Sequence, residues 1–412
     1  MDCGSYRFLR PQLHRFRDLL RPGDLASLEN PRDSAGGFMK AFSPATIGTL
    51  HLKNRFVRSA TYDGMAERSG MVSDAQIDLY RKLAEGEVGL IVTGIASVHP
   101  SGRISAFQNR IDGDDTLPGW RRLIQTVHDA GSRIAMQLFH GGRESWIYQK
   151  AKRSMALAPS VVPNDPYCDA EYRAIREEEI LEVIGAFAEA AARAREAGCD
   201  GVQLHAAHAY LFSQFLSPAA NLRTDRWGGG LDGRLRFLEE VYRAVRKTVG
   251  PDYPILVKLG VADGFSGGLD FTEGREAAIR CARWGFDAIE VSQGLRGKRY
   301  AETEFRCGIR KRNDEGYFRQ WAREIQAAVS VPVIMVGGIR SPEFVEEVLE
   351  KGEAAFVAIS RPLIREPDLI ARWQSGDLRP ATCLSCNRCF DAILKGNTLH
   401  CAMEEVTSVP AS

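Results

Sequence analysis

The stretch PVIMVGGIRSPEFVEEVLEKGEAAFVAISR, residues 332–361, decides the fold. Its apolar run at 332–337 is followed by a segment with helical periodicity at 342–350 and by a second apolar run at 355–360. Continuous apolar runs of this length are typical of strands that are buried on both faces, as in parallel sheets. Gly352, just after the helical segment, is a residue type that readily takes the left-handed conformation at a helix end. The stretch therefore predicts two parallel strands joined by a helix.

This unit recurs from about residue 50 onward, so that eight apolar runs alternate with eight helical segments. The runs lie at 55–60 (RFVRSA), 89–94 (GLIVTG), 133–139 (RIAMQLF), 201–205 (GVQLH), 254–259 (PILVKL), 287–292 (DAIEVS), 332–337 (PVIMVG) and 355–360 (AFVAIS). The helical segments lie at 77–85, 120–130, 177–197, 234–249, 272–284, 317–329, 342–350 and 368–374. Eight such units predict a single α/β domain that closes as a (β/α)8 TIM barrel. An open, doubly wound sheet is the alternative, because periodicity alone does not show whether a sheet closes.

The chain has 412 residues, of which 44% are hydrophobic and 26% are charged, and its net charge is +1. These are the values of a globular protein, and so small a charge provides no field that would attract nucleic acid or an anionic membrane. No run of about 18 uncharged apolar residues is present, so no membrane span is expected. The nine cysteines are an odd number and follow no secretory leader, which favours a reducing compartment, with a cytoplasmic location as the default.

Three ring side chains follow the fourth predicted strand, in the segment HAAHAYLFSQFLSP at 205–218. His205, His208 and Tyr210 would lie together at the carboxyl end of the barrel, where active sites of this fold form. Such donors can hold a carbonyl oxygen and stabilise the negative charge that develops on it, and a tyrosine stays protonated at neutral pH. The alternatives are a pair of structural histidines, or a metal site that would lack a nearby carboxylate or cysteine ligand.

Other strand ends also contain polar groups or glycines. Lys258 lies inside an apolar run, where its charge is costly unless it faces the barrel mouth and an anionic partner. The amide of Gln137 offers a donor and an acceptor to the edge of a heterocycle. After the seventh and eighth strands, where TIM barrels usually bind phosphate, the chain has Gly337, Gly338, Ser360 and Arg361.

Two of the loops that follow strands are too long to be simple connections, at 140–176 and 293–313. Loops longer than about 12–15 residues are usually functional, so both are expected to shape the substrate mouth. The second loop is strongly basic and contains Arg296, Lys298, Arg299, Arg306, Arg310, Lys311 and Arg312. These basic residues either form a solvated surface loop or attract a carboxylate or a CoA-type phosphate.

Several stretches together resemble the Old Yellow Enzyme family of FMN-dependent ene reductases, over residues 41–377. The two most specific are QLFHGGR at 137–143 and AGCDGVQLHAAHAYLFSQFLSPAANLRTDRWGG at 197–229. The others are LKNRFVRSAT at 52–61, GLIVTGIASVHPSGR at 89–103, VGGIRSP at 336–342 and SRPLIREPDL at 360–369. The resemblance implies a TIM barrel that binds FMN, is reduced by NAD(P)H and acts on a small-molecule substrate.

The resemblance also implies roles for particular residues. Gln137 would hold the pyrimidine edge of the flavin, and Lys258 would lie beside its N1 and O2. His205 and His208 would hold the substrate carbonyl, while Tyr210 gives a proton to the α carbon. The flavin would be lined by Ser59, Ala60, Thr61, Gly94 and Ile95, and its phosphate would be bound by Gly337, Gly338, Ser360 and Arg361.

A cysteine-rich tail at 379–412 follows the barrel. Cys383, Cys386, Cys389 and Cys401 give the spacing C-x2-C-x2-C-x11-C. This spacing suits a [4Fe–4S] cluster and, taken alone, also tetrahedral zinc. The arrangement is similar to the cluster motif of longer relatives, trimethylamine dehydrogenase and 2,4-dienoyl-CoA reductase. A motif that has lost its cluster is the alternative.

We expect the protein to reduce an activated C=C bond in an enone, enoate or enoyl thioester with NAD(P)H. The alternative is an FMN and iron–sulfur subunit for electron transfer, or for amine or enoate oxidation, which would need a partner protein. A homo-oligomer is left open, and no nucleic acid partner is expected. The substrate is open as well, because Tyr62, Asp63 and Ser360 depart from the family pattern at the barrel mouth.

The chain thus divides into an N-terminal extension at 1–38, an FMN-binding TIM barrel at 39–378 and the cysteine-rich tail at 379–412. The extension is basic and amphipathic, as a targeting arm would be, but its aspartates depart from the acid-poor composition of such arms. We therefore expect a partly disordered leader, or a true start of translation at Met39.

Overall fold

The computed structural model of the chain describes residues 39–165, 168, 170–394 and 398–403. The N-terminal extension predicted at 1–38 lies outside the described residues, whereas most of the cysteine-rich tail up to residue 403 lies within them. No helix in this described part of the chain is long and apolar enough to cross a membrane.

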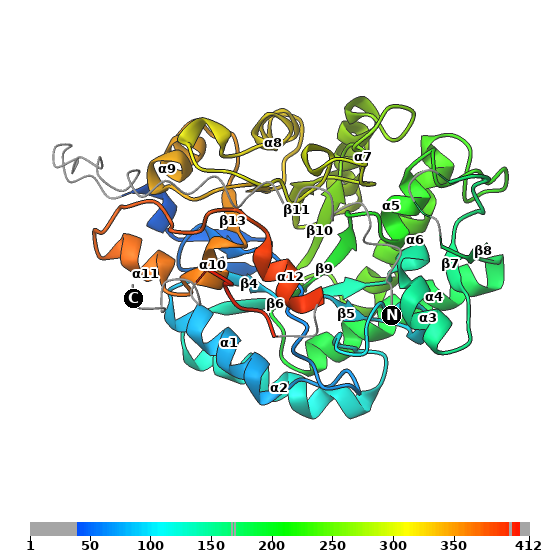
Figure 1. The fold of residues 1–412 in the computed structure, drawn as a ribbon, viewed down its shortest axis with the longest axis horizontal. Helices are drawn as coiled ribbons and strands as arrows, with labels where there is room; N and C mark the ends of the chain where they lie inside the picture. The colour runs from blue at the N-terminus through cyan, green and yellow to red at the C-terminus, as the bar shows by residue number, and fades with distance from the viewer. Residues whose placement is uncertain (1–38, 166–167, 169, 395–397, 404–412) are drawn as a thin grey trace, which may run out of the picture.

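Eight parallel strands form one closed barrel (Figure 1). They are β3 (Phe56–Arg58), β4 (Leu90–Val92), β6 (Arg133–Phe139), β9 (Gly201–Ala206), β10 (Ile255–Gly260), β11 (Ala288–Ser292), β12 (Val333–Val336) and β13 (Phe356–Ile359). Each strand pairs with the next one around the ring, and β13 pairs with β3, which closes the sheet. The prediction of a TIM barrel is therefore confirmed, and the open sheet is excluded.

The helices that follow the strands lie outside the barrel (Figure 1). They are α1 (Asp74–Glu85), α2 (Leu117–Asp129), α4 (Glu177–Glu196), α6 (Leu231–Val249), α7 (Phe271–Trp284), α8 (Arg319–Gln326), α9 (Pro342–Glu350) and α11 (Leu369–Gln374). Helix α4 buries Ile180, Val183 and Phe187, whose spacing of three and four residues puts them on one side. A capping box at Ser73 begins α1, and Gly285 ends α7 in the left-handed conformation, with φ of 106°.

Helix α8 is shorter than the helix predicted at 317–329. The amide of Tyr317 donates to the carbonyl of Gly337 at 3.2 Å, so this residue belongs to the loop before the helix. Its ring lies against Gly337 and Gly338, where a Cβ atom would approach the ring to about 3 Å. The aromatic residue that sequence periodicity assigned to the helix is thus used at the barrel mouth.

A hairpin of β1 (Ala45–Ile47) and β2 (Leu50–Leu52) fills the barrel interior at the amino ends of the strands. Ile47, Leu50 and Leu52 are buried there in one cluster with apolar residues of the barrel strands. Gly48 makes the turn with φ of 54°, and a Cβ atom on it would lie 2.4 Å from Asp287 Oδ1. The turn therefore requires glycine for both its backbone conformation and its close contact. With this end filled, the opposite end of the barrel is left for the site.

The loop predicted at 140–176 contains structure of its own. It includes α3 (Trp146–Ala151), β7 (Ala156–Ala158) and β8 (Tyr172–Ala174), and the two strands pair in a small parallel sheet. The tail contains α12 (Arg388–Leu394), drawn in red in Figure 1, which lies across the barrel close to α10 (Pro362–Arg365).

The barrel interior offers a direct test of how much packing stabilises the fold. Leu256 of β10 is fully buried inside the barrel. We expect Leu256→Ala to lower the free energy of unfolding by about 2–5 kcal/mol, because it removes buried methyl groups and leaves a cavity. Leu222→Ala is the control at a leucine that is 50% exposed, and it should change this free energy by less than about 0.5 kcal/mol. Urea unfolding followed by circular dichroism measures both, and equal losses would contradict the assignment of Leu256 to the core.

Candidate active site

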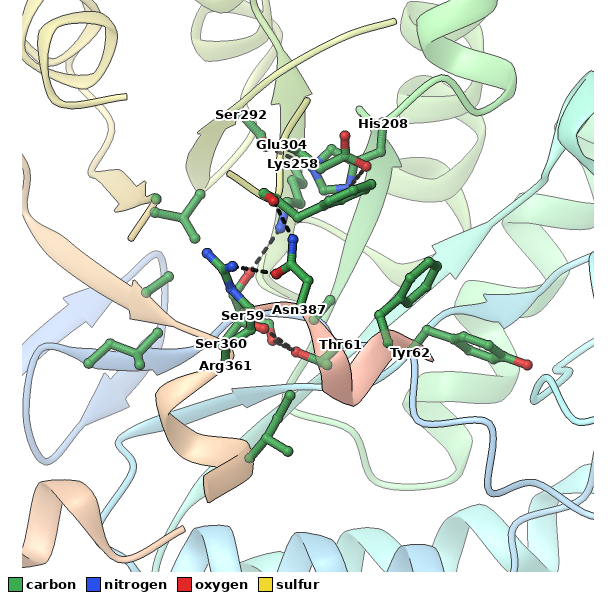
Figure 2. Close-up of a pocket in the computed structure, with 18 of the residues that line it drawn as sticks. Ser59, Thr61, Tyr62, His208, Lys258, Ser292, Glu304, Ser360, Arg361 and Asn387 are labelled. Carbon is green, nitrogen blue, oxygen red and sulfur yellow. Dashed lines mark hydrogen bonds and ion pairs between the residues drawn. The ribbon is translucent and has the colours of Figure 1, made fainter. Parts of the chain in front are cut away.

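A cavity lies at the carboxyl ends of the barrel strands (Figure 2). The predicted flavin and substrate residues that line it are Ser59, Ala60, Thr61, Gln137, His205, His208, Tyr210, Lys258, Gly337, Gly338, Ser360 and Arg361. Gly94 is not part of this lining. Its amide donates to the hydroxyl of Tyr80 at 2.7 Å, whereas Ile95, which was predicted together with it, lines the cavity. The fold thus brings together residues from distant parts of the chain, as predicted from their positions at strand ends.

A buried ion pair between Lys258 and Glu290 lies at the floor of this cavity. Lys258 Nζ lies 3.0 Å from Glu290 Oε1 and donates to Ser59 Oγ at 2.9 Å. Ser59 Oγ donates in turn to Glu290 Oε1 at 2.6 Å. Both charged side chains are almost completely buried, and buried charges are stable only when they are paired and hydrogen-bonded. Glu290 is therefore the anionic partner that the position of Lys258 requires.

Two glutamines extend this polar network across the barrel. Gln203 Nε2 donates to Glu290 Oε2 at 2.9 Å, and Gln137 Nε2 donates to Gln203 Oε1 at 2.7 Å. The carbonyl oxygen of Gln137 is left for a ligand that carries an N–H donor. The sequence motifs do not single out Glu290 or Gln203. The available signal was the same as for Lys258, a polar side chain inside an apolar strand.

The three rings predicted to hold the substrate lie together at the end of β9. The ring centroids of His205 and His208 are 4.9 Å apart, and those of His205 and Tyr210 are 5.0 Å apart. His208 and Ala209 have positive φ angles of 61° and 64°, which side chains other than glycine rarely adopt. Their amides donate to the carbonyls of Gln293 and Gly294. The loop after β11 thus holds this strained turn in place, as is common at functional sites.

Both histidines are neutral near physiological pH. Burial, and then the positive charges of Lys258 and Arg296, lower the pKa of His205 and His208 well below the usual value. His205 Nδ1 is buried without a hydrogen-bond partner, whereas His208 Nε2 lies 2.7 Å from Ser292 Oγ. Burial raises the pKa of Tyr210 to about 12, so its hydroxyl keeps its proton. The site therefore presents neutral donors to a ligand.

The other end of the predicted site surrounds Arg361. Gly337 and Gly338 have φ angles of 125° and 73°, so the backbone here takes a conformation that favours glycine and can approach a ligand closely. Ser360 Oγ lies 2.8 Å from Thr61 Oγ1. Figure 2 shows Arg361 pointing toward Asn387 of the tail, to which its Nη1 donates at 2.5 Å.

Comparisons with known proteins agree with this arrangement. The NADH:flavin oxidoreductase / NADH oxidase family matches residues 40–378. This chain belongs to that family. A metal reductase of Desulforamulus reducens is 36% identical over 364 residues, which are 87% of this chain and 52% of that protein. An NADH oxidase of Thermoanaerobacter brockii is 36% identical over 354 residues, 85% of this chain and 53% of that protein.

Among solved structures, a 2-naphthoyl-CoA reductase complex has a TM-score of 0.81 and 26% identity, covering 88% of this chain and 56% of that one. The chain spans about half the length of the curated relatives described here. The resemblance to the Old Yellow Enzyme family is confirmed.

The cavity of this family member fits FMN by its chemistry. Lys258 and the free carbonyl oxygen of Gln137 offer a cation and an acceptor to the polar edge of a flavin ring. Side chains on Gly337 and Gly338 would collide with the ring of Tyr317, so this part of the wall is bare backbone. Exposed backbone amides and an arginine are the usual partners of a phosphate.

The tail of the family member forms part of the cavity wall. Ser385, Asn387, Cys389, Phe390, Ile393 and Leu399 line the cavity with the barrel residues. Asn387 is the centre of this contact, because its Nδ2 donates to the carbonyl of Phe305 at 2.7 Å and to Cys307 Sγ at 3.1 Å. Its Oδ1 accepts from Arg361. The sequence did not predict that the tail folds back onto the site.

The four tail cysteines lie in one region but are not arranged as a metal site. Within the described residues, no group of three or more His, Cys, Asp or Glu side chains has metal-binding geometry. The thiols form no disulfide. Burial first, and then the neighbouring Cys383 and Cys386, raise the pKa of Cys389 to about 11. Ser385 and Asn387 have positive φ angles of 50° and 59°, so the chain turns sharply between the cysteines.

The basic loop at 293–313 lines the cavity through Arg296 and Phe305, but much of its charge is paired within the chain. Arg296 pairs with Glu304, Arg299 with Glu302 and Arg312 with Glu347. None of the described residues of the loop at 140–176 lines the cavity, although Glu144 approaches Arg296 to 3.9 Å. These pairs reduce the attraction for an anion that the sequence of the loop suggested.

The buried pair in the barrel generates a stability prediction. Glu290→Ala should lower the free energy of unfolding by about 3–5 kcal/mol, because it leaves the charge of Lys258 buried and unpaired. The double variant Lys258→Met/Glu290→Leu, which removes both charges, should lose less than the single variant. Urea unfolding of the cofactor-free proteins measures both values. A double variant as unstable as the single one would show that an unpaired charge is not the cause.

Proposed function

We propose that the protein uses NAD(P)H to reduce the C=C bond of an α,β-unsaturated carbonyl compound, that is, an enone, enoate or enoyl thioester. The observation that carries this proposal is the group of three ring donors at the end of β9, in which His205 Nδ1 is buried without a partner. Donors placed to hold a carbonyl oxygen serve the reduction of a conjugated double bond and have no role in simple electron transfer. The relative named NADH oxidase supports a nicotinamide nucleotide as the electron donor.

Bound FMN would accept a hydride from NAD(P)H and supply it to the β carbon of the substrate. Gln137 and Lys258 hold the polar edge of the flavin, where the lysine favours negative charge. Ser59, Ala60 and Thr61 would line the ring, whereas Gly94 lies behind this wall and does not line the cavity. Gly337, Gly338, Ser360 and Arg361 would bind the phosphate.

The histidines and the tyrosine have separate roles in the reaction. Neutral His205 and His208 donate to the substrate carbonyl and stabilise the negative charge that develops on its oxygen. Tyr210 then gives its proton to the α carbon, so that its O–H bond breaks and a C–H bond forms. Solvent returns a proton to the phenolate. This assignment rests on the positions of the three rings in one cavity.

Tyr210→Phe tests the proton transfer. This variant should leave bleaching of the flavin by NAD(P)H unchanged and slow reoxidation by cyclohex-2-enone by about 10²–10⁴-fold, because only the second half-reaction needs the acid. Stopped-flow absorbance of the flavin measures the two half-reactions separately. Tyr253→Phe is the control, since it removes a hydroxyl that donates to the carbonyl of Cys199 at the other end of the barrel. Equal slowing of both half-reactions by Tyr210→Phe would reject the role of acid.

A second candidate function is an electron-transfer or dehydrogenase subunit that needs a partner protein. It is favoured by Cys389, a cysteine of the tail that lines the same cavity as the flavin site. The same stopped-flow experiment separates the two candidates. FMN that neither NADH nor NADPH bleaches would favour the partner-dependent subunit, and rapid bleaching would favour the self-sufficient reductase.

We also propose that Cys383, Cys386, Cys389 and Cys401 hold a [4Fe–4S] cluster, which requires their side chains to come into a metal-binding arrangement that they do not have in this structure. Their C-x2-C-x2-C-x11-C spacing supports the proposal.

The cluster is tested by metal analysis of anaerobically purified protein. We expect about four irons per chain, because that is the content of one cubane cluster. Cys386→Ser should lose the iron. Cys307→Ser is the matched control, since Cys307 contacts Asn387 but lies outside the spacing motif, and it should retain the iron. One zinc and no iron per chain would overturn this assignment.

A further inference from the structure

Arg296, in the loop after β11, lies beside the proposed acid of the reaction. Its guanidinium carbon is 5.6 Å from the centroid of the Tyr210 ring, in a cation–π contact. Arg296 and Tyr210 both line the cavity. The positive charge of the guanidinium therefore lies next to the ring of the proposed acid.

Arg296 is held in this position by other groups. Its Nε donates to Glu304 Oε1 at 2.8 Å, its Nη2 lies 2.7 Å from the same oxygen, and Glu144 Oε2 lies 3.9 Å from its Nη1. The ring of Phe305 lies on the guanidinium as well, at 5.9 Å from its carbon to the ring centroid. A planar guanidinium with fixed donors on several sides has little freedom to turn away.

We infer that Arg296 is a positioning residue for Tyr210 and the counter-ion of the phenolate that forms when Tyr210 gives its proton to the substrate. The inference deepens the proposed function and rests on it. When the β carbon has been reduced, the electron pair at the α carbon takes the proton of Tyr210, the O–H bond breaks and the C–H bond forms. The negative charge then lies on the phenolate of Tyr210, beside the guanidinium of Arg296, whose positive charge stabilises it.

The surroundings of Tyr210 make such a counter-ion necessary. Burial raises the pKa of Tyr210 most, and the carboxylates of Glu304 and Glu144 raise it further. Arg296 is the cation that lowers it. His205, whose ring centroid is 5.0 Å away, is neutral because its own pKa is lowered by burial. Without Arg296, the phenolate would form in a buried place with two carboxylates beside it.

Three variants and a control distinguish the loss of the positive charge of Arg296 from other structural effects of replacing this residue. Arg296→Gln removes the cation, and Arg296→Lys keeps a charge without the planar fork. The double variant Arg296→Gln/Glu304→Gln removes the arginine without leaving Glu304 unpaired and charged. Arg299→Gln is the control in the same loop, because among the described residues Arg299 pairs only with Glu302, and its side chain is 78% exposed. Each variant is prepared with its FMN bound.

The first measurement is the rate of each half-reaction with cyclohex-2-enone as the probe. Arg296→Gln should slow alkene reduction about tenfold or more, corresponding to at least one pKa unit of lost phenolate stabilisation. Flavin bleaching by NAD(P)H should be unchanged, and the solvent deuterium isotope effect on alkene reduction should rise. Arg296→Lys should recover part of the rate. The double variant should stay slow. Full recovery of the rate in it would show that the unpaired charge of Glu304 caused the loss, and would overturn the inference.

The second measurement does not depend on activity. Fluorotyrosine placed at position 210 is titrated by fluorine NMR in the parent protein, in Arg296→Gln and in Arg299→Gln. Its midpoint should rise in Arg296→Gln, because removal of a cation disfavours the phenolate, and should stay unchanged in Arg299→Gln. An unchanged midpoint in Arg296→Gln overturns the inference. Normal alkene reduction by Tyr210→Phe would instead overturn the proposed function, and the titration keeps the two failures distinct.

Discussion

The buried pair of Lys258 and Glu290 is the interaction on which the rest of the site depends. A cation in the middle of a barrel is stable only with an anion beside it, and the anion needs further donors. Glu290 obtains them from Ser59 and Gln203, and Gln203 in turn fixes the amide of Gln137. One requirement for charge balance therefore orients side chains from β6, β9, β10 and β11 and from the end of β3. The positive charge of Lys258 also lowers the pKa of both histidines at the mouth, so that they remain neutral donors.

The loop that begins at Gln293 connects the parts of the site that lie above this floor. Its first residues accept the amides of the strained turn at His208 and Ala209. Arg296 lies on Tyr210, and Glu304 Oε1 lies 4.0 Å from His208 Nδ1. Further along, the carbonyl of Phe305 accepts from Asn387 and that of Arg306 accepts from Arg361. A single loop thus contacts the substrate-holding rings, the proposed phosphate site and the tail.

The barrel and most of the site could be predicted from the sequence, because both depend on local patterns. Apolar runs mark the strands, and polar residues at their ends mark the mouth, as Lys258 and the histidines illustrate. Glu290 has the same physical signal as Lys258, a charged side chain inside an apolar strand, and lies opposite it in the register of the two strands. The contact of Asn387 with Arg361 could not be predicted, since no periodicity relates the tail to a strand end 26 residues before it. The ion pairs of Arg296 with Glu304 and of Arg299 with Glu302 lie within the basic loop, and composition alone does not reveal such pairing.

Arg361 shows how the tail and a phosphate can use the same part of the barrel. Its Nη1 makes two hydrogen bonds, to Asn387 Oδ1 at 2.5 Å and to the carbonyl of Arg306 at 2.8 Å. These use both protons of that nitrogen, while the guanidinium has five N–H donors in all. The Nε and Nη2 donors make no hydrogen bond to the described residues, and this edge of the guanidinium is the one that can bind two phosphate oxygens at once. A phosphate bound at this edge would therefore not compete with the tail, and the hydrogen bonds of Nη1 would already hold the side chain in one orientation for it.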